Sequence, residues 1–545
     1  MRDHEFVGQI EFERRVYRVR EGETVLAALL RGGADVASSC RKGSCHTCML
    51  QVTEGDAPAA SRARLSPELQ ASGAFLPCVA ECSGRVVAKR LDLSTTFRSF
   101  LVDKKDLLSA DVLRLRLEPP QDFTWRAGQS VQVRHPGGAS RSFSIASSPT
   151  GYFVELHVRR RPGGAVSPWL FDEVASGDEV FLRGPTGTCT YDASMRGRPL
   201  VLVGTGTGGA MLRAIIEDAL AGGHEAPIRF CHGARTAEEL YLRRELAEIA
   251  ARHPNVDVRC VASRAEVDGR AAARITDVAF ERDEDLAGAV LFFCGSPDMI
   301  YDARVAAIAR GARHKDIHAD PFEIGGQAWC PTPTDAEKLA ATAPDPELWA
   351  ALGDGALLNV ILSEFYGIVY EDPRLLPYFR RVTKQRAIEK QYAFLRDVFA
   401  GTKDYFGTKP FNAHHWMVIT DELFDYREEL FFDCVRRHGF PERLIRRWAA
   451  FHEEFRREIV KSVERGMIID GREQPLLGFE EEVLEAGGVC DGCEGEIVPN
   501  TTVRLWHRTG EVFCGACIAR RLSALPPAGS HAPPEIPVAK PPSVI

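Results

Sequence analysis

The sequence lacks long hydrophobic segments: across 545 residues, no apolar run reaches the roughly 18 residues of a membrane-spanning helix. It also lacks an excess of positive charge, because 68 Lys and Arg residues against 76 Asp and Glu residues give a net charge of -8. No basic run offers a face for phosphate groups, and the charged N-terminus, residues 1–20, does not resemble a signal peptide. These absences argue against membrane and nucleic-acid partners and favour a cytoplasmic location.

The composition is that of a soluble globular protein, with 45% hydrophobic and 26% charged residues. At roughly 150 residues per domain, the length predicts about three to five domains. The 15 cysteines show no pairing pattern, but eight of them fall into two tight clusters. In a reducing compartment, clustered cysteines indicate metal sites rather than disulfides.

The first cysteine cluster follows two expected strands, at 6–13 and 15–19, and a short apolar helix at 24–30. Three cysteines in one loop and a fourth from a distant strand have the ligand spacing of a plant-type 2Fe-2S ferredoxin. A zinc site is the weaker alternative, because zinc ligands usually come in two Cys-x2-Cys pairs. Cys82 is expected to be a buried thiol. The candidate cluster ligands are Cys40, Cys45, Cys48 and Cys78.

The second cysteine cluster consists of two Cys-x2-Cys pairs separated by 20 residues. This spacing predicts a tetrahedral, structural Zn2+ site in a small treble-clef-like module, because four thiolates leave no open position for catalysis. A rubredoxin-type iron site is the alternative. An acidic stretch at 480–485, just before the module, is expected to be helical. The candidate ligands are Cys490, Cys493, Cys514 and Cys517.

A four-residue stretch, Arg141-Ser142-Phe143-Ser144, suits a flavin. A guanidinium is a fixed fork of donors for phosphate, an aromatic ring can cover the flavin or ribose, and a hydroxyl can donate to the ring edge. Downstream, a glycine-rich turn runs into a helix at 162–170, where Gly164 and Ser167 suit a diphosphate. Each motif alone could be a surface strand or a turn, but together they are more specific.

An unbroken apolar run at 199–203 predicts a buried parallel strand, which a glycine loop and a helix from about residue 210 follow. Glycines let the backbone approach the pyrophosphate of a dinucleotide at the start of a helix. A second apolar run at 290–293 predicts another buried strand, whose end at Cys294 and Gly295 is expected to open onto a crevice. The candidate nicotinamide-site residues are Gly204, Gly206, Thr207, Gly208, Gly209, Cys294 and Gly295.

The order of these flavin and nicotinamide motifs resembles the ferredoxin-NADP reductase family over residues 97–323. The resemblance implies an FAD-binding β-barrel and an α/β nicotinamide-binding sheet, and it places Cys294 beside the nicotinamide and Phe322 near the flavin. With the ferredoxin motif in front, residues 1–323 resemble the reductases of aromatic-ring dioxygenases, of the benzoate dioxygenase reductase type.

The nucleotide preference depends on a short segment after the next expected strand. An NADPH-binding site would gather basic groups there for the 2′-phosphate, but Arg235 is followed by Glu238 and Glu239. Since these two acids would repel a phosphate, NADH is expected rather than NADPH.

A helical block follows at 347–465, and its apolar residues recur at helical spacing. Leu358, Ile361, Leu362, Phe365 and Val369 share one helical face, and further helical periods occur within 388–398 and 442–460. Such a pattern alone predicts only a helical bundle with core histidines and aromatic residues.

Three ordered motifs in this block, at 364–366, 371–379 and 413–418, resemble the truncated haemoglobins. The resemblance implies haem b with His414 as the proximal iron ligand, while Phe379 packs on the porphyrin and Tyr366 and Gln391 reach the distal pocket. His415 is the alternative ligand, because adjacent helical positions point about 100° apart and only one can face the iron.

The expected protein is therefore multidomain, and the expected bounds are a β-grasp 2Fe-2S ferredoxin at 1–92, an FAD-binding β-barrel at 97–196, an α/β NAD(P)-binding domain at 197–323, a linker at 324–346, an all-α truncated globin at 347–465, a connector at 466–488, a zinc module at 489–523 and a disordered Pro-rich tail at 524–545.

The expected activity is that of an NAD(P)H-dependent oxidoreductase, because a flavin can accept a hydride and release single electrons to a 2Fe-2S cluster and a haem. With dioxygen and nitric oxide as substrates, the chain would be a nitric oxide dioxygenase, similar in logic to flavohaemoglobins. The alternative is a reductase for a separate protein acceptor such as an oxygenase, with the globin as a gas sensor or carrier and the zinc module as a docking element.

Overall fold

The structure is a computed structural model that describes residues 6–20, 22–36, 38, 41, 43, 46–82, 84–92, 96–282, 284–322, 339, 342–380, 382–403, 405, 409–461, 464–469, 472–474, 476, 479–484, 488–493, 495–508 and 511–522. These residues belong to two compact units, one spanning Phe6–Glu464 and one containing Arg465–Ile545. Most of the predicted linker and the whole of the predicted tail lie outside the described residues. Within the described ranges, no helix combines the length and the apolar character needed to cross a bilayer.

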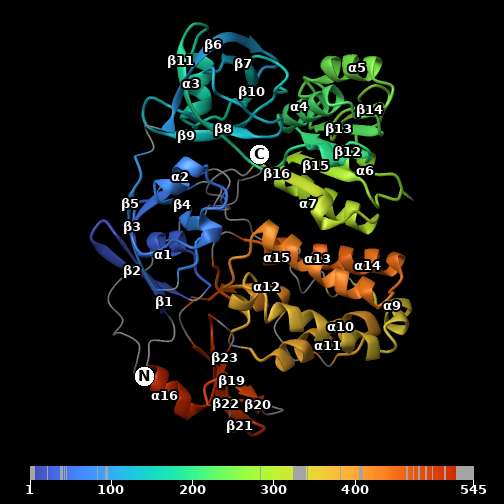
Figure 1. Cartoon of the computed structure of the whole chain (residues 1–545). Coiled ribbons are helices and arrows are strands. Elements are labelled where there is room, and N and C mark those ends of the chain that lie inside the picture. Colours follow the sequence, from blue (N-terminus) through green and yellow to red (C-terminus); the bar gives the residue numbers. More distant parts are fainter. Residues whose placement is uncertain are drawn as a thin grey trace, which may run out of the picture. The chain divides into compact units, whose positions relative to one another are not determined.

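The first domain is a mixed five-stranded sheet in the order β2-β1-β5-β3-β4 (Figure 1). One helix, α1, begins after Thr24, whose side chain accepts a hydrogen bond from the Ala27 amide at 3.2 Å. The helix buries Val25 and Leu29 in the core of this domain, so the predicted β-grasp is confirmed. The elements are β1 (Phe6–Phe12), β2 (Arg15–Arg20), α1 (Val25–Arg31), β3 (Leu50–Glu54), α2 (Pro67–Ala71), β4 (Ala74–Phe75) and β5 (Gly84–Arg90).

The second domain is a six-stranded antiparallel sheet in the order β10-β7-β6-β11-β8-β9. Alternate side chains along the strands, such as Leu113, Leu115 and Leu117 of β7, are buried in one core. The predicted FAD-type barrel is confirmed. The elements are β6 (Arg98–Leu107), β7 (Val112–Glu118), β8 (Ser130–Arg134), β9 (Ser140–Ser144), β10 (Val154–Arg159), α3 (Val166–Asp172) and β11 (Glu179–Thr186).

The third domain has a parallel five-stranded sheet in the order β14-β13-β12-β15-β16. The chain runs outward from β12 in one direction and then crosses to β15 on its other side, so the carboxyl ends of β12 and β15 form a topological switch point, where ligands bind in such sheets. The elements are β12 (Leu200–Thr205), α4 (Gly208–Ala221), β13 (Ile228–Ala234), α5 (Arg243–Arg252), β14 (Val256–Ala262), α6 (Ile275–Ala279), β15 (Val290–Gly295), α7 (Pro297–Ala309) and β16 (Ile317–Pro321).

The fourth domain is helical, as predicted. Thr383 and Thr420 cap the N-termini of α11 and α13 through their side chains, and Gly401 ends α11 in the left-handed conformation with φ of 74°. All five apolar residues predicted on one face of α10 are buried. The helices are α9 (Pro346–Ala351), α10 (Ala356–Val369), α11 (Lys384–Ala400), α12 (Pro410–His414), α13 (Asp421–Arg437), α14 (Glu442–Glu453) and α15 (Arg456–Ile459).

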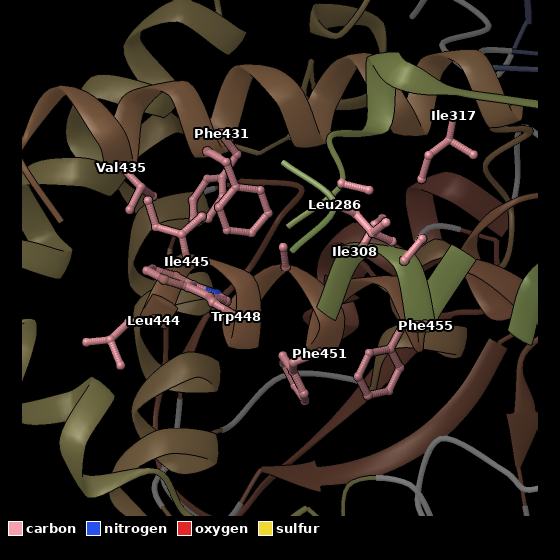
Figure 2. Close-up of a cluster of buried hydrophobic side chains, with 14 of the residues drawn as sticks. Leu286, Ile308, Ile317, Phe431, Val435, Leu444, Ile445, Trp448, Phe451 and Phe455 are labelled. Carbon is pink, nitrogen blue, oxygen red and sulfur yellow. The ribbon is translucent and has the colours of Figure 1, made fainter. Parts of the chain in front are cut away.

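The helical domain and the nucleotide-binding domain share one hydrophobic core. Figure 2 shows Phe431 and Trp448, from α13 and α14, in the same cluster of buried side chains as Leu286, Ile308 and Ile317 of the nucleotide-binding domain. Trp448 and Phe431 are fully buried in it. Because apolar burial is the main stabilising term in folding, the two domains stabilise each other.

The second compact unit contains short antiparallel sheets. The predicted acidic helix at 480–485 is wrong, since β19 pairs with β22 along its whole length. Phe479 lies on the ring of Trp506 with centroids 4.6 Å apart, and Glu481 pairs with Arg504 at 2.7 Å. Long-range pairing overrides the helix preference of the glutamates. The elements are β17 (Ile468–Ile469), β18 (Arg472–Glu473), β19 (Phe479–Leu484), β20 (Gly488–Val489), β21 (Glu496–Ile497), β22 (Thr501–Trp506), β23 (Glu511–Phe513) and α16 (Gly515–Leu522).

Candidate active site and cofactor sites

The predicted flavin stretch forms strand β9, which pairs with β8 so that Phe143 faces Val131 and Arg141 faces Val133. Arg141 is exposed and Phe143 is half-buried, so both remain accessible to a ligand. The Ser144 hydroxyl donates to Asp320 Oδ2 at 3.1 Å, and this bond joins the barrel to the end of β16 in the nucleotide-binding domain. The stretch therefore lies where the two domains meet, as a flavin that receives a hydride requires.

The predicted diphosphate turn precedes the short helix α3. Gly163 has a φ of 75°, which favours glycine, and the Ser167 hydroxyl accepts a hydrogen bond from the Arg161 amide at 3.0 Å. The Gly164 amide donates back to the Arg161 carbonyl at 3.1 Å. The turn is therefore tightly closed, with Ser167 buried at its base.

The glycine loop after β12 packs too closely against its surroundings for any side chain. A Cβ on Gly208 would lie 2.4 Å from the Cys294 carbonyl oxygen, and a Cβ on Gly209 would lie 2.7 Å from the His232 ring. Gly295 has a φ of 124°, and a Cβ there would lie 2.4 Å from the Thr205 hydroxyl. The structure thus brings the two predicted tips together at the switch point, and glycine is required at each contact.

Arg159 is a candidate binding residue that the motifs did not identify. Its Nη2 atom lies 3.6 Å from where a Cβ on Gly206 would be. Its buried Nε and Nη2 atoms make no hydrogen bond within the described part of the chain, although Asp111 lies 3.4 Å from Nε. A buried guanidinium with unused donors beside a glycine loop fits an anionic phosphate. The sequence signal was the run of three arginines at 159–161.

Cys294 is completely buried, and its Sγ lies 3.5 Å from the sulfur of Met211. Burial raises the pKa of Cys294 well above its ordinary value, so it is a neutral thiol. Phe322 lies next to this strand end, because its amide donates a hydrogen bond to the Gly295 carbonyl at 2.8 Å. The structure therefore brings Phe322, Cys294 and the glycine loop to one edge of the sheet.

A buried ion pair fixes the glycine-loop helix against the barrel. Arg213 of α4 donates to Glu155 Oε1 at 2.5 Å and to the Ala146 carbonyl at 2.8 Å. Burial opposes ionisation of Glu155, but His157 and Arg213 hold its pKa below the ordinary value. The pair joins strand β10 of the barrel to the helix that follows the glycine loop.

In the ferredoxin domain, Cys48 and Cys78 are both buried, each with 4% of its surface exposed. Cys40 and Cys45 lie outside the described residues. Gly43 has a φ of 76°, as a tight loop requires. Cys82 is buried, as predicted, and burial raises the pKa of its thiol. Two buried thiols from separate elements fit part of a cysteine-ligated cluster.

His414 ends α12, and its Nδ1 lies 2.8 Å from the Pro410 carbonyl oxygen. Because a carbonyl only accepts, Nδ1 carries the proton and Nε2 keeps a lone pair, which is the arrangement of an iron-ligating imidazole. His414 is half-buried, whereas the alternative ligand His415 is 1% exposed and packed against protein. His415 Nδ1 makes the same kind of contact, with the Asn412 carbonyl oxygen, so the two histidines differ here in exposure. An imidazole of this tautomer fits haem, and His414 stays the predicted iron ligand.

The predicted distal residues come from α10 and α11. Tyr366 is buried, and its ring meets Phe379 edge to face with centroids 5.7 Å apart. Burial raises the pKa of Tyr366, so its hydroxyl remains a donor. Gln391 is half-buried, and no hydrogen bond in the described chain joins it to Tyr366. Tyr405 was not predicted: burial and the nearby Tyr366 raise its pKa to about 12.

In the second unit, the Sγ atoms of the four clustered cysteines lie within 4.8 Å of one another. A tetrahedral zinc with bonds of about 2.3 Å places its sulfurs about 3.8 Å apart, and Cys493 and Cys514 are already separated by 3.9 Å. The amides of Gly492 and Cys514 donate to Cys490 Sγ at 3.4 and 3.3 Å, which stabilises a thiolate. The residues fit a zinc site with four cysteine ligands.

Comparisons with known proteins identify four domains in the chain. Residues 9–83 match the 2Fe-2S iron-sulfur cluster binding domain, residues 99–191 the oxidoreductase FAD-binding domain, residues 202–305 the oxidoreductase NAD-binding domain, and residues 347–460 the bacterial-like globin family.

Among curated proteins, the chain is 35% identical over 319 residues to the reductase subunit of an aromatic O-demethylase from Amycolatopsis sp., covering 55% of this chain and 94% of that protein. It is 31% identical over 332 residues to the reductase component of a phenol 2-monooxygenase from Pseudomonas sp., covering 57% and 93%. Among solved structures, a cytochrome P450 reductase from Amycolatopsis matches with a TM-score of 0.43 and 32% identity, covering 58% of this chain and 98% of that one.

Proposed function

The chain belongs to the family of NAD(P)H-dependent reductase components of oxygenase systems, which contain FAD and a 2Fe-2S cluster, and in this chain the reductase is followed by a bacterial-like globin. We propose that the chain uses NADH to reduce its own globin haem for the oxygen-dependent removal of nitric oxide.

The observation that carries this proposal is the shared core. A complete reductase and a globin form one compact unit, and helices α13 and α14 contribute to the same buried cluster as α7. Covalent linkage alone raises the effective concentration of two partners to about the millimolar range. A fixed interface adds a constant orientation, which suits a haem that must be reduced again in every turnover.

When bound, FAD converts a hydride into single electrons, the 2Fe-2S cluster carries one electron at a time, and the haem iron binds the gas. The protein's own residues bind and orient the nucleotide. Arg159 and the glycine loop would hold the pyrophosphate, and Arg141 would hold the phosphate of the flavin. The Ser144 hydrogen bond to Asp320 keeps the two domains in register.

NADH is the proposed electron donor because Arg235, the basic residue that could bind a 2′-phosphate, already forms an ion pair. Arg235 Nη2 donates to Glu239 Oε1 at 2.8 Å, and the Arg235 amide donates to the same carboxylate at 3.3 Å. A 2′-phosphate would have to displace Glu239 from this pair and would be repelled by its charge.

In the globin, His414 would hold the iron, while Tyr366 and Gln391 would present hydrogen-bond donors to the gas. Such donors would stabilise a gas molecule that acquires negative charge on binding. The Tyr366 hydroxyl stays protonated, because burial raises its pKa. Phe379, edge to face with Tyr366, would restrict the ring to this orientation.

The test is an anaerobic optical titration of the haem-loaded chain with NADH, followed by dioxygen and nitric oxide. We expect the haem to become ferrous and nitrate to form with turnover. Tyr366→Phe should slow nitric oxide consumption while leaving NADH-dependent cytochrome c reduction intact. Tyr370→Phe is the matched control, since its hydroxyl donates to the Val382 carbonyl. Equal loss of both activities in Tyr366→Phe would contradict the assignment.

A second candidate function follows from the relatives, which are reductase components of separate oxygenases. In that case the reductase would serve a separate acceptor and the globin would sense or carry a gas. The same titration separates the two: reduction of the flavin and cluster with the haem left ferric would favour this candidate.

A further inference from the structure

The ferredoxin domain contacts the FAD-type barrel through its cluster loop. Gln132 of β8 donates from Nε2 to the Thr47 hydroxyl at 2.6 Å, and Arg183 of β11 donates to the His46 carbonyl at 3.3 Å. Gln132 and Arg183 are both buried, and they also hydrogen bond to each other. Thr47 directly precedes Cys48, so this contact lies next to a predicted cluster ligand.

The same domain contacts the globin on another surface. Gly22 lies against the Trp416 ring so closely that a Cβ on Gly22 would be 2.6 Å from it. Next to this contact, Thr24 forms a β-bridge with Glu81. The Tyr378 hydroxyl donates to the Val418 carbonyl at 2.9 Å and lies 3.4 Å from Glu81 Oε1. Trp416 is 7% exposed, so the contact is closed to water.

Charged groups surround this contact. Arg64 of the ferredoxin domain forms an ion pair with Glu422 at the start of α13. Arg20 Nη1 lies 4.0 Å from Glu464 Oε2, and both side chains are 6% exposed. The ferredoxin surface thus supplies arginines to globin carboxylates, and the charges of the two surfaces are complementary.

Each side of the contact lies close in sequence to a predicted redox ligand. Glu81 is three residues beyond Cys78, a candidate cluster ligand, and Trp416 is two residues beyond His414, the candidate iron ligand. Tyr378 directly precedes Phe379, the residue expected on the porphyrin. The surface therefore joins a ferredoxin segment next to a predicted cluster ligand to a globin segment next to the predicted iron ligand.

We propose that the ferredoxin surface formed by Gly22, Arg64 and Glu81 is a built-in docking surface whose partner is the chain's own globin, and that the globin receives its electrons there. This inference rests on the proposed function. The chemistry balances: one NADH is oxidised to NAD+ with release of one proton, and its two electrons reduce two ferric irons to ferrous in separate single-electron steps. A separate acceptor protein could use this surface only after displacing the globin.

The sharpest test introduces a methyl group into the contact. Gly22 has a φ of 69° and Gly33 a φ of 80°, so alanine has a similar backbone cost of about 1 kcal/mol at either position. Only Gly22→Ala also meets Trp416, because no atom lies within 4 Å of a Cβ on Gly33. Gly33→Ala in the same domain is therefore the matched control.

In the haem-loaded chain, we expect Gly22→Ala to slow reduction of the haem by NADH about tenfold or more, since the intramolecular contact is displaced. Cytochrome c reduction should be unchanged or faster, because the surface becomes open to an external acceptor. Hydrogen exchange in 409–418 should increase in Gly22→Ala and not in Gly33→Ala. A merely structural role would lower both electron-transfer rates together.

A second variant tests the same surface by removing a charge rather than by adding atoms to the contact. Arg64→Ala removes the ion pair with the globin, and Arg85→Ala removes pairs with Glu11 and Glu54 inside the ferredoxin domain. We expect only Arg64→Ala to slow haem reduction, and to do so more strongly at low salt. If NADH reduces the haem of the unaltered chain, and Gly22→Ala and Arg64→Ala reduce their haem at the same rate, the docking proposal is wrong. If NADH does not reduce the haem of the unaltered chain although dithionite does, the proposed function is wrong.

Discussion

A single buried carboxylate, Glu453, should decide whether the globin and the nucleotide-binding domain remain associated. It ends α14, is fully buried, and accepts hydrogen bonds from Arg304 Nε and His314 Nε2, each at 3.1 Å. Arg456 Nη2 donates to it at 2.9 Å, and Asp425 pairs with both arginines. Arg304 and His314 belong to the nucleotide-binding domain, whereas the other three residues belong to the globin.

Replacing Glu453 with Gln keeps the shape but removes the charge, so the two buried guanidinium groups share Asp425, and Arg456 keeps one further partner in Asp421 at 3.3 Å. Removing one partner of a buried ion pair costs about 3–5 kcal/mol, and we expect the lower value here because two anions, Asp425 and Asp421, remain. A loss of about 3 kcal/mol should lower the melting temperature of this part of the chain by roughly 6–12 °C.

The assay is thermal unfolding of the full chain, followed by tryptophan fluorescence, with hydrogen exchange of α7 and α14 to locate the change. Glu442→Gln is the control at the other end of α14, because its pair with Arg436 is solvent-exposed and is expected to contribute at most about 1 kcal/mol. If Glu453→Gln shifts the unfolding no more than Glu442→Gln, the interface does not depend on this network and the reasoning is wrong.

Three further predictions follow from other sites. Burial would raise the pKa of Glu428, but Arg427 and His452 lower it from 4.5 to about 2, so its contribution of roughly 3 kcal/mol should be present above pH 4.5 and be lost as the pH falls towards 2; Glu428→Gln should flatten this part of the stability profile, and an unchanged profile would contradict the assignment. Metal analysis should find one zinc per chain, and Cys490→Ser or a chelator should release it and increase hydrogen exchange in β22 (Thr501–Trp506) only; retention of the metal in Cys490→Ser would count against the site. Glu239→Gln should free the guanidinium beside it and lower KM for NADPH while KM for NADH changes little, and steady-state kinetics showing no gain for NADPH would exclude this basis for nucleotide preference.

The sequence by itself determined those features whose chemistry is local. Cysteine spacing identified the ferredoxin loop and the zinc pairs, because their ligands lie a few residues apart and the loop length sets the geometry. The glycine loop at 204–209 could be predicted from the sequence for the same reason. The helical spacing of apolar residues in α10 predicted its buried face. The domain types followed from the order of these local signals along the chain.

The tertiary structure alone decided the features that depend on residues far apart in sequence. The stretch Phe479–Leu484 is a strand because Trp506 and Arg504 lie opposite it, although its glutamates favour a helix. Arg159 is a candidate phosphate-binding residue only because strand β10 places it beside the glycine loop. The shared core, the Glu453 network and the contact of Gly22 with Trp416 each join residues more than 100 positions apart. No local pattern encodes such pairings, because burial and charge complementarity select them only once the domains have folded against one another.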